Sequence, residues 1–558
     1  MGATDNSGDP RGGSPAAPEP RDLTGVPHLD RILGGGLPRG SLVLVLGVPG
    51  SGKTTLAGQI AFTAARAGKR VLILTAFSES TSKLIAHLRA FSYFEPSLIG
   101  GVVQFLSLQS SLAEGLETAA DAILSEARRV KAAVVVLDGF RGLDSLTGSA
   151  RAARQFLFTV GTTLSALGAT LLITAETDPR DPTFFPEATT ADVILGMQYQ
   201  LFGVRQHRGI EVIKARTSAP LPGLHAMTLS ADGVSVYPQL EERIAADVLG
   251  SEAQTQGAAP GGAQSESALD PGPARAAFGL PELDTMLAGG IPRATCTLLV
   301  GSLGTGKTLM SLYFALAGVR NGEAVAYLGF RESQRQLRLA ASAFEIGPAL
   351  EKALRPGGSL TFLEVPPIKV NADILADRLL HLLDHTGARR LVIDSVAELE
   401  RAILRSPDPQ RLEDYLAALL IALRERGVTA LMLKETDKAI AATLDFSADP
   451  LSVLAENVIL LQQVPYAGEL HRILAVLKLR FSGHDTTLRE FRITSPAGLE
   501  VLEPGMSEHD VLAGITERQQ QHAGHLQSGE EPRHSRNRPA QPKPSQPPLR
   551  PGSTDDAG

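Results

Sequence analysis

The sequence contains the same eight-residue, glycine-rich pattern twice. GVPGSGKT at residues 47–54 and GSLGTGKT at residues 301–308 both match the P-loop pattern G-x-x-x-x-G-K-[ST] at every fixed position. Each match follows a short apolar run and precedes a helical pattern, which is the strand–loop–helix context that phosphate binding requires. A chance glycine turn could imitate the pattern once, but two full matches in the same context exclude that explanation.

The residue types in these loops predict a bound nucleoside triphosphate with Mg²⁺. Backbone N–H groups of the loop cradle phosphate oxygens, the lysine neutralises the β- and γ-phosphates, and the hydroxyl after it holds the metal. The predicted cofactors are therefore ATP and Mg²⁺. The predicted nucleotide contacts are Gly47, Gly50, Ser51, Gly52, Lys53, Thr54 and Thr55 in the first loop, and Gly301, Gly304, Thr305, Gly306, Lys307, Thr308 and Leu309 in the second.

The two loops belong to a duplication of a whole domain. GLPELD at residues 279–284 repeats GVPHLD at 25–30, and GGIP at 289–292 repeats GGLP at 35–38. In each half, apolar runs of four to six residues alternate with helical patterns, which predicts a mainly parallel sheet covered by helices on both faces. The expected organisation is a disordered segment (1–22), a first domain (23–243), a flexible linker (244–276), a second domain (277–506) and a disordered tail (507–558).

Carboxylates at the ends of two apolar runs in each half complete the predicted chemistry. Asp138 and Asp394 each end such a run and are predicted Mg²⁺ ligands together with Thr54 and Thr308, because the carboxyl end of a parallel strand lies beside the phosphates. Hydrolysis also needs a carboxylate that orients or deprotonates the attacking group. Glu79 and Glu332 occupy equivalent places for that role, with the lysines as the other catalytic candidates; alternatively, each glutamate caps the helix that follows it.

A pair of basic residues lies near the end of each half. Lys214 and Arg216, and likewise Lys478 and Arg480, are two apart on a predicted strand and so point to the same face. Adjacent like charges favour a bound anion, although a solvated strand edge is the alternative. Cations that a neighbouring subunit supplies to a γ-phosphate would form an arginine-finger arrangement. That interpretation predicts a ring with ATP at the subunit interfaces.

These motifs resemble the KaiC group of RecA-like ATPases over nearly the whole stretch from Leu23 to Glu503. The most specific part of the resemblance is the second half, from NVILLQ at residues 457–462 through Lys478 and Arg480 to REF at 489–491. The resemblance implies tandem RecA-like P-loop domains, a homo-hexamer and ATP between neighbouring subunits. It also implies that the first domain mainly hydrolyses ATP, while the second phosphorylates its own Ser or Thr beside the neighbour's nucleotide.

Two departures from the family pattern affect the predicted activity. The family carries paired carboxylates after a phenylalanine, and here Ser78 and Arg331 replace the first of each pair. The family's Ser-Thr phosphorylation pair matches Ser452 and Val453, and valine has no hydroxyl. Ser452 is therefore the one phosphosite that the resemblance carries over, and a serine at a helix start is the alternative. No sequence resembles the clock's partner-binding tail, so the family name does not imply rhythm-keeping.

Composition separates the competing functions. A net charge of −7, no tryptophan and 5% aromatic residues argue against a RecA-like DNA-handling ATPase, so nucleic acid is not an expected partner. No apolar run approaches the ~20 residues of a membrane span, and the polar N-terminal segment lacks a signal-peptide core, so the expected location is cytoplasmic. The predicted function is a ring ATPase that acts as a signalling switch on unknown protein partners. Serine/threonine autokinase activity in the second domain is a further expectation from the resemblance. A nucleotide-sensing scaffold with little turnover is the other alternative.

Overall fold

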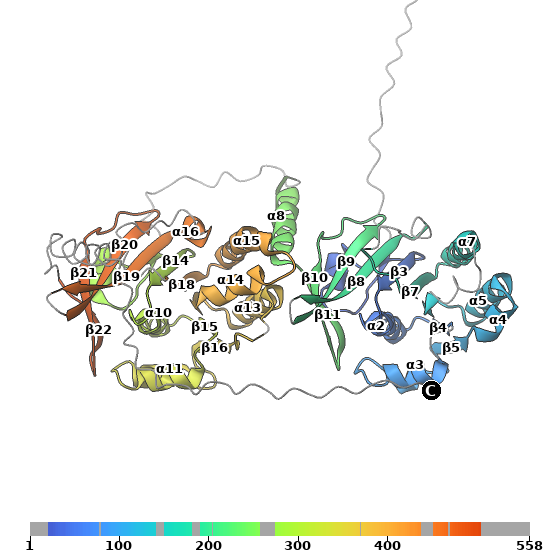
Figure 1. The fold of residues 1–558 in the computed structure, drawn as a ribbon, viewed down its shortest axis with the longest axis horizontal. Coiled ribbons are helices and arrows are strands. Elements are labelled where there is room, and N and C mark those ends of the chain that lie inside the picture. The colour runs from blue at the N-terminus through green and yellow to red at the C-terminus, as the bar shows by residue number, and fades with distance from the viewer. Residues whose placement is uncertain are drawn as a thin grey trace, which may run out of the picture.

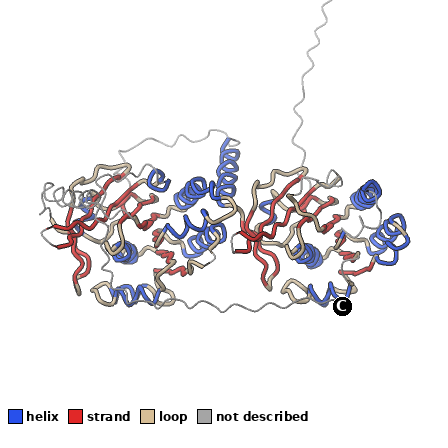
Figure 2. The backbone as a smooth tube through the Cα atoms, in the orientation of Figure 1, coloured by secondary structure: helices blue, strands red, loops and turns tan. Residues whose placement is uncertain are grey.

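The computed structural model describes residues 20–76, 80–140, 150–180, 190–202, 205–256, 274–368, 370–436, 450–466 and 469–503. The chain forms two similar units, each built around a nine-stranded sheet with helices packed on both faces (Figures 1 and 2). This arrangement confirms the predicted fold class of tandem RecA-like α/β domains.

The first sheet has the strand order β11-β10-β9-β8-β3-β7-β6-β4-β5. The strands from β8 to β5 in this order run parallel, and β9, β10 and β11 extend the sheet with antiparallel pairings. The P-loop strand β3 thus lies near the middle of the sheet. The strands are β3 Leu42–Gly47, β4 Val71–Thr75, β5 Val103–Ser107, β6 Val134–Asp138, β7 Thr170–Ala175, β8 Val193–Phe202, β9 Arg205–Ala215, β10 His225–Ser230 and β11 Gly233–Tyr237.

The second sheet repeats this topology in the order β16-β15-β17-β18-β14-β19-β20-β21-β22. Its P-loop strand β14 is flanked by the parallel strands β18 and β19, as β3 is flanked by β7 and β8. The duplication inferred from sequence is therefore a duplication of the fold. The strands are β14 Cys296–Gly301, β15 Val325–Gly329, β16 Leu360–Glu364, β17 Arg390–Asp394, β18 Thr429–Glu435, β19 Asn457–Tyr466, β20 Glu469–Leu479, β21 Arg489–Thr494 and β22 Gly498–Val501.

The helices connect the parallel strands, and a short two-stranded ribbon precedes each P-loop strand. The ribbons are β1 Arg21–Asp22 with β2 Leu37–Pro38, and β12 Arg275–Ala276 with β13 Ile291–Pro292. In the first half the α-helices are α1 Leu29–Ile32, α2 Lys53–Arg66, α3 Thr81–Leu88, α4 Gln109–Glu114, α5 Leu116–Val130, α7 Ala150–Ala166 and α8 Leu240–Gln256. In the second they are α9 Pro281–Met286, α10 Lys307–Arg320, α11 Gln334–Ala341, α12 Gly347–Ala353, α13 Ala372–Thr386, α14 Val396–Leu404, α15 Leu412–Glu425 and α16 Pro450–Leu454. Within the described residues, the 3₁₀ turns are η1 Pro96–Leu98 and η4 Pro409–Arg411.

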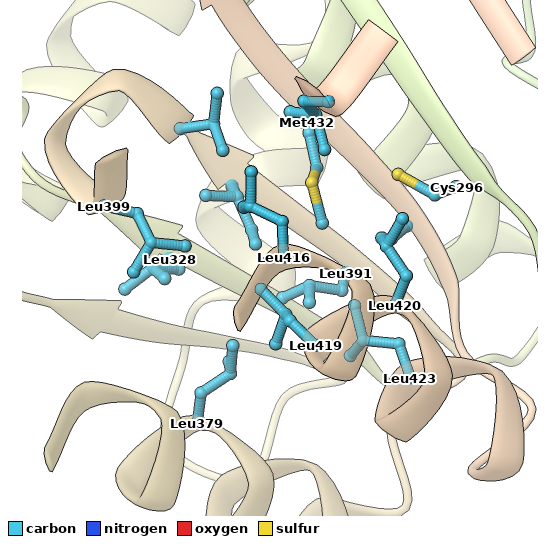
Figure 3. Packing of buried hydrophobic residues seen from close by; sticks show 14 of the residues in the cluster. Cys296, Leu328, Leu379, Leu391, Leu399, Leu416, Leu419, Leu420, Leu423 and Met432 are labelled. Atoms are coloured by element: carbon cyan, nitrogen blue, oxygen red, sulfur yellow. The ribbon is translucent and has the colours of Figure 1, made fainter. Parts of the chain in front are cut away.

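Hydrophobic packing on both faces of each sheet explains why the central strands are apolar throughout. Every residue of β3 and β14 is buried, as expected for parallel strands that are covered by helices on both sides. In the second domain, Leu416 and Leu423 of α15 pack in a cluster with Leu391 of β17 and Met432 of β18 (Figure 3). Cys296, at the start of β14, is buried in the same cluster.

Helix α8 departs from the flexible linker predicted for residues 244–276. The helix continues to Gln256 and lies beside α15 of the second domain (Figure 1). Leu240 and Ile244 are buried in the core of the second domain, and Val248 packs against that core. This spacing of four places the three side chains on one helix face, a signal that the small and polar neighbours obscured. Residues 257–273 lie outside the described residues, and the domain boundaries stay predictions.

The segments predicted to be disordered, 1–22 and 507–558, lie almost wholly outside the described residues. Among the helices that the structure describes, none is both long enough and apolar enough to cross a membrane.

Candidate nucleotide-binding sites

Each P-loop runs from the end of its strand into the first turn of a helix. Gly50 and Gly52 have φ angles of 78° and 103°, and Gly304 and Gly306 have 77° and 96°. These left-handed conformations are strained for residues with a side chain, so the backbone itself requires glycine at these four positions. Both loops end where α2 and α10 begin, and a helix N-terminus favours a bound anion.

The predicted lysines fold back over their own loops. Lys53 Nζ donates to the carbonyl of Val48 at 3.1 Å, and Lys307 Nζ donates to the carbonyls of Gly301 and Ser302, both at 2.8 Å. Each lysine is only 8% exposed. Burial lowers the pKa of both lysines, and nearby carboxylates oppose that shift. A buried ammonium group that donates to carbonyl oxygens of its own loop is well placed to bind phosphate oxygens.

The predicted metal ligands meet in both halves. Thr54 Oγ1 donates to Asp138 Oδ1 at 3.1 Å, and Thr308 Oγ1 donates to Asp394 Oδ2 at 2.9 Å. Asp138 is 6% exposed and also accepts a 2.6 Å hydrogen bond from Thr174 Oγ1. One hydroxyl and one carboxylate fit Mg²⁺, which keeps several waters and binds phosphate oxygens rather than a full protein cage.

A tyrosine that sequence reasoning missed supports the aspartate of the second site. Tyr327, on β15, donates its hydroxyl to Asp394 Oδ2 at 3.0 Å and lies 3.2 Å from Ser311 Oγ. Burial raises the pKa of Asp394, while the hydrogen bonds from Thr308 and Tyr327 and the charge of Lys307 oppose the rise. The carboxylate is therefore a costly buried charge in the free protein, and a bound cation would stabilise it.

Of the two candidate catalytic glutamates, the structure describes Glu332. Glu79 lies outside the described residues. Glu332 follows β15, and burial together with the charge of Asp394 raises the pKa of Glu332. The helix after it is capped by Ser333, which accepts a hydrogen bond from the backbone N–H of Gln336. Since Ser333 fills the capping position, the proposal that Glu332 acts on the nucleophile does not compete with a capping role.

Two further carboxylates face the P-loop lysines and were not predicted. Glu176 directly follows β7, and its charge opposes the burial-lowered pKa of Lys53. Glu435 ends β18 and does the same for Lys307. The signal that could have identified them is the triplet Glu-Thr-Asp, which begins at residue 176 in one half and at residue 435 in the other.

The basic pairs lie at the opposite end of the sheet from the P-loop of the same chain. In the first sheet, Gly47 pairs with Met197, whereas Val193, four residues earlier on β8, pairs with Ala215 between the two basic residues. Four residues of strand span roughly 13 Å. Arg216 lies 3.5 Å from Asp192 at this far end. The structure therefore does not bring Lys214 and Arg216 to the phosphate site of their own chain.

The second basic pair has an additional local role. Lys478 Nζ donates to the carbonyls of Ala455 at 2.6 Å and Val453 at 3.3 Å, so it binds the C-terminal end of α16. Ser452, the candidate phosphosite on α16, is 6% exposed, whereas Val453 is 56% exposed. The side chain at the solvent-exposed position is thus the one that lacks a hydroxyl.

Comparison with known proteins agrees with this geometry. The family model described as "ATPase: KaiC" matches residues 23–241 and again residues 276–506. The chain belongs to the KaiC ATPase family. It is 26% identical over 506 residues to the circadian clock oscillator protein KaiC of Thermostichus vulcanus, an alignment that covers 89% of this chain and 91% of the relative. The KaiC of Nostoc sp. is 25% identical over 502 residues, covering 88% and 91% of the two chains.

Proposed function

We propose that this KaiC-family chain binds and hydrolyses Mg²⁺-ATP at both of its P-loops. The observation that carries the proposal is the convergence, in both halves, of a buried lysine, a threonine hydroxyl and a strand-end aspartate at one glycine-rich loop. Mg²⁺ bound at Thr54 with Asp138, and at Thr308 with Asp394, would supply charge neutralisation for the phosphates. The lysines would bind the phosphates and hold them in line for attack.

The carboxylates of each site would act on the attacking water. Glu332, and Glu79 in the first domain, are the proposed groups that orient the water or accept its proton. The burial-raised pKa of Glu332 moves this carboxyl toward the pH at which a general base is most effective.

We further propose that ATP lies between subunits of a homo-hexameric ring. Lys214 with Arg216, and Lys478 with Arg480, lie at the end of the sheet opposite the P-loop of their own chain, which supports a role at the phosphate site of a neighbouring chain. Such cations would stabilise charge on the γ-phosphate in the transition state. A cytoplasmic location and action as a signalling switch on unknown protein partners complete the proposal.

Transfer of phosphate to the chain itself is the finer part of the proposal, and Ser452 is its candidate acceptor. Because Ser452 is buried and Lys478 binds the end of its helix, transfer requires α16 to move. A Ser452→Ala protein that incorporates label from γ-labelled ATP as well as the wild type would exclude this acceptor.

Mixing of two inactive variants tests the shared site. One variant carries Lys307→Ala, and the other carries Lys478→Ala with Arg480→Ala, both in a Lys53→Ala background that silences the first domain. If sites form between subunits, mixed rings contain interfaces with an intact P-loop and an intact basic pair. We expect turnover to recover on mixing. Turnover that stays at the level of the separate variants would contradict a shared site.

A further inference from the structure

Glu435 lies at the point where the second P-loop begins. The residue ends β18 and pairs in register with Gly301, the first glycine of the loop on β14. The next residue, Thr436, donates its backbone N–H to the carbonyl of Gly301 at 3.2 Å. Lys307 Nζ donates to the same carbonyl at 2.8 Å. The end of β18 and the P-loop lysine therefore converge on one peptide group.

The carboxylate of Glu435 acts electrostatically on both charged groups of the phosphate site. Glu435 pairs in register with Gly301, whose carbonyl accepts the hydrogen bond from Lys307, and Asp394 pairs with Leu433, two residues before Glu435 on β18. The carboxylate therefore interacts electrostatically with both Lys307 and Asp394. Because Lys307 and Asp394 are the residues that would hold the last phosphate of ATP and its metal, a negative charge beside them would also lie near that phosphate. It would repel that phosphate unless a cation compensates it.

Arg331 provides the compensating cation. Its Nη1 donates to Glu435 Oε2 at 3.3 Å, and its Nε donates to Glu398 Oε1 at 2.9 Å. Glu398, on α14, has a side chain only 8% exposed, and it also accepts a 2.6 Å hydrogen bond from Arg401 Nη1. Two carboxylates thus hold the Arg331 guanidinium, and one of them is Glu435.

The sequence places a cation at this position in the second half and not in the first. The first half has the equivalent carboxylate, Glu176, whose charge acts on Lys53. At the position that matches Arg331, however, the sequence has Ser78, which carries no charge. The two P-loops agree at every fixed position of the motif and their variable positions carry no charge, so the difference in charge between the sites lies in the residues around them.

We propose that Arg331 and Glu435 form a specificity-determining pair that sets how strongly the second site prefers ATP over ADP. This inference rests on the proposed nucleotide-binding function and adds nucleotide specificity to it. Glu435 contributes a negative charge beside the place of the third phosphate, and Arg331 offsets that charge. The guanidinium replaces the first of the family's paired carboxylates, so this position supplies a cation that offsets Glu435 rather than a second base.

The test measures nucleotide affinity rather than turnover. In the full-length chain with Lys53→Ala, calorimetric titrations with Mg²⁺ compare ADP with a non-hydrolysable ATP analogue. We expect Arg331→Gln to lower the ratio of analogue affinity to ADP affinity about three- to tenfold, because it removes the guanidinium that offsets the charge of Glu435. Glu435→Gln should raise the ratio, and the double variant should lie near the parent protein. Arg401→Gln is the matched control, because it removes a cation from Glu398 without touching Glu435, and it should leave the ratio unchanged.

The outcomes separate this inference from the proposed function. If Arg331→Gln and Glu435→Gln change the two affinities by the same factor, or if Arg401→Gln alters the ratio as Arg331→Gln does, the pair has only a structural role and the inference fails. If the parent protein binds neither nucleotide, or binds both in a way that Lys307→Ala does not affect, the proposed function fails instead. Arg331→Lys, which keeps the charge, should retain most of the parent ratio.

Discussion

Replacement of Arg411 by methionine should destabilise the junction between the two halves far more than a typical surface substitution. Arg411 follows α14 at the end of η4 and binds two carboxylates in bidentate fashion. It donates to Glu241 of α8 at 2.5 and 2.7 Å, and to Asp373 of α13 at 2.6 and 2.8 Å. The side chains of Arg411, Glu241 and Asp373 are 10%, 14% and 5% exposed. Arg411 therefore links α8 to the second domain through two largely buried carboxylates.

The expected loss of stability follows from the two carboxylates that the substitution leaves without a cation. Burial by itself lowers the pKa of Arg411, but the hydrogen bonds to Asp373 and Glu241 outweigh burial and raise that pKa, so the guanidinium is charged throughout the accessible pH range. Methionine would leave two largely buried carboxylates without their cation, which costs about 3–5 kcal/mol. The matched control is Arg426→Met. Arg426 is also bidentate, to Asp384 at 2.8 and 3.1 Å, but the Asp384 side chain is 54% exposed, so the cost should be about 0–1 kcal/mol.

Denaturant unfolding followed by circular dichroism, together with hydrogen exchange, would measure the effect. A chain with two domains does not unfold in one step, so midpoints of the individual transitions are compared rather than one unfolding free energy. We expect a clearly lower midpoint for the second-domain transition in Arg411→Met, and faster amide exchange in α8. Equal midpoints for Arg411→Met and Arg426→Met, with unchanged exchange in α8, would refute the reasoning.

Three further predictions concern the sites themselves. Thr308→Ala in a Lys53→Ala background should weaken the Mg²⁺ dependence of turnover and lower turnover at least about tenfold, whereas Thr308→Ser should retain it; equal loss in both would argue against metal binding by the hydroxyl. Asp394→Asn should raise the unfolding temperature of the nucleotide-free protein at pH 8 but not at pH 4. The folded-state pKa of Asp394 is raised by burial, so its charged form destabilises the fold only once the pH exceeds the unfolded value, and a shift of equal size at both pH values would contradict this. Lys478→Ala should increase amide exchange in α16, because it removes the hydrogen bonds to Ala455 and Val453, and unchanged exchange would show that the lysine does not hold the helix.

The sequence was sufficient to predict the fold class and the parts of the site that depend on local pattern. The P-loop fixes its own backbone through glycines at left-handed positions, and strand-end aspartates are detectable because parallel strands expose their carboxyl ends together. Local pattern alone therefore predicts the pairing of Thr54 with Asp138 and of Thr308 with Asp394. The structure places both pairs within hydrogen-bond distance.

What the sequence did not reveal depends on contacts between distant segments. Glu176 and Glu435 lie near the lysines because β7 and β18 are the sheet neighbours of the P-loop strands. This strand order in the sheet differs from the order along the chain, so the sequence alone does not predict it. In the sequence, Arg331 stands where the family has a carboxylate. Its role depends on a contact with Glu398, which is more than sixty residues away along the chain. The prediction of a flexible linker was wrong for α8, because small and polar residues surround the three regularly spaced apolar side chains that pack on the second domain.

The most direct test of the account is ATP turnover by the full-length chain, measured beside Lys53→Ala, Lys307→Ala and the double variant. Both lysines are buried at glycine-rich loops that also hold a threonine–aspartate pair, so we expect each single variant to lose part of the turnover and the double variant to lose essentially all of it. Release of phosphate from ATP in the presence of Mg²⁺ is the readout, with nucleotide binding measured on the same samples. Turnover in the double variant that equals that of the wild type would contradict the claim that these two loops are the catalytic sites.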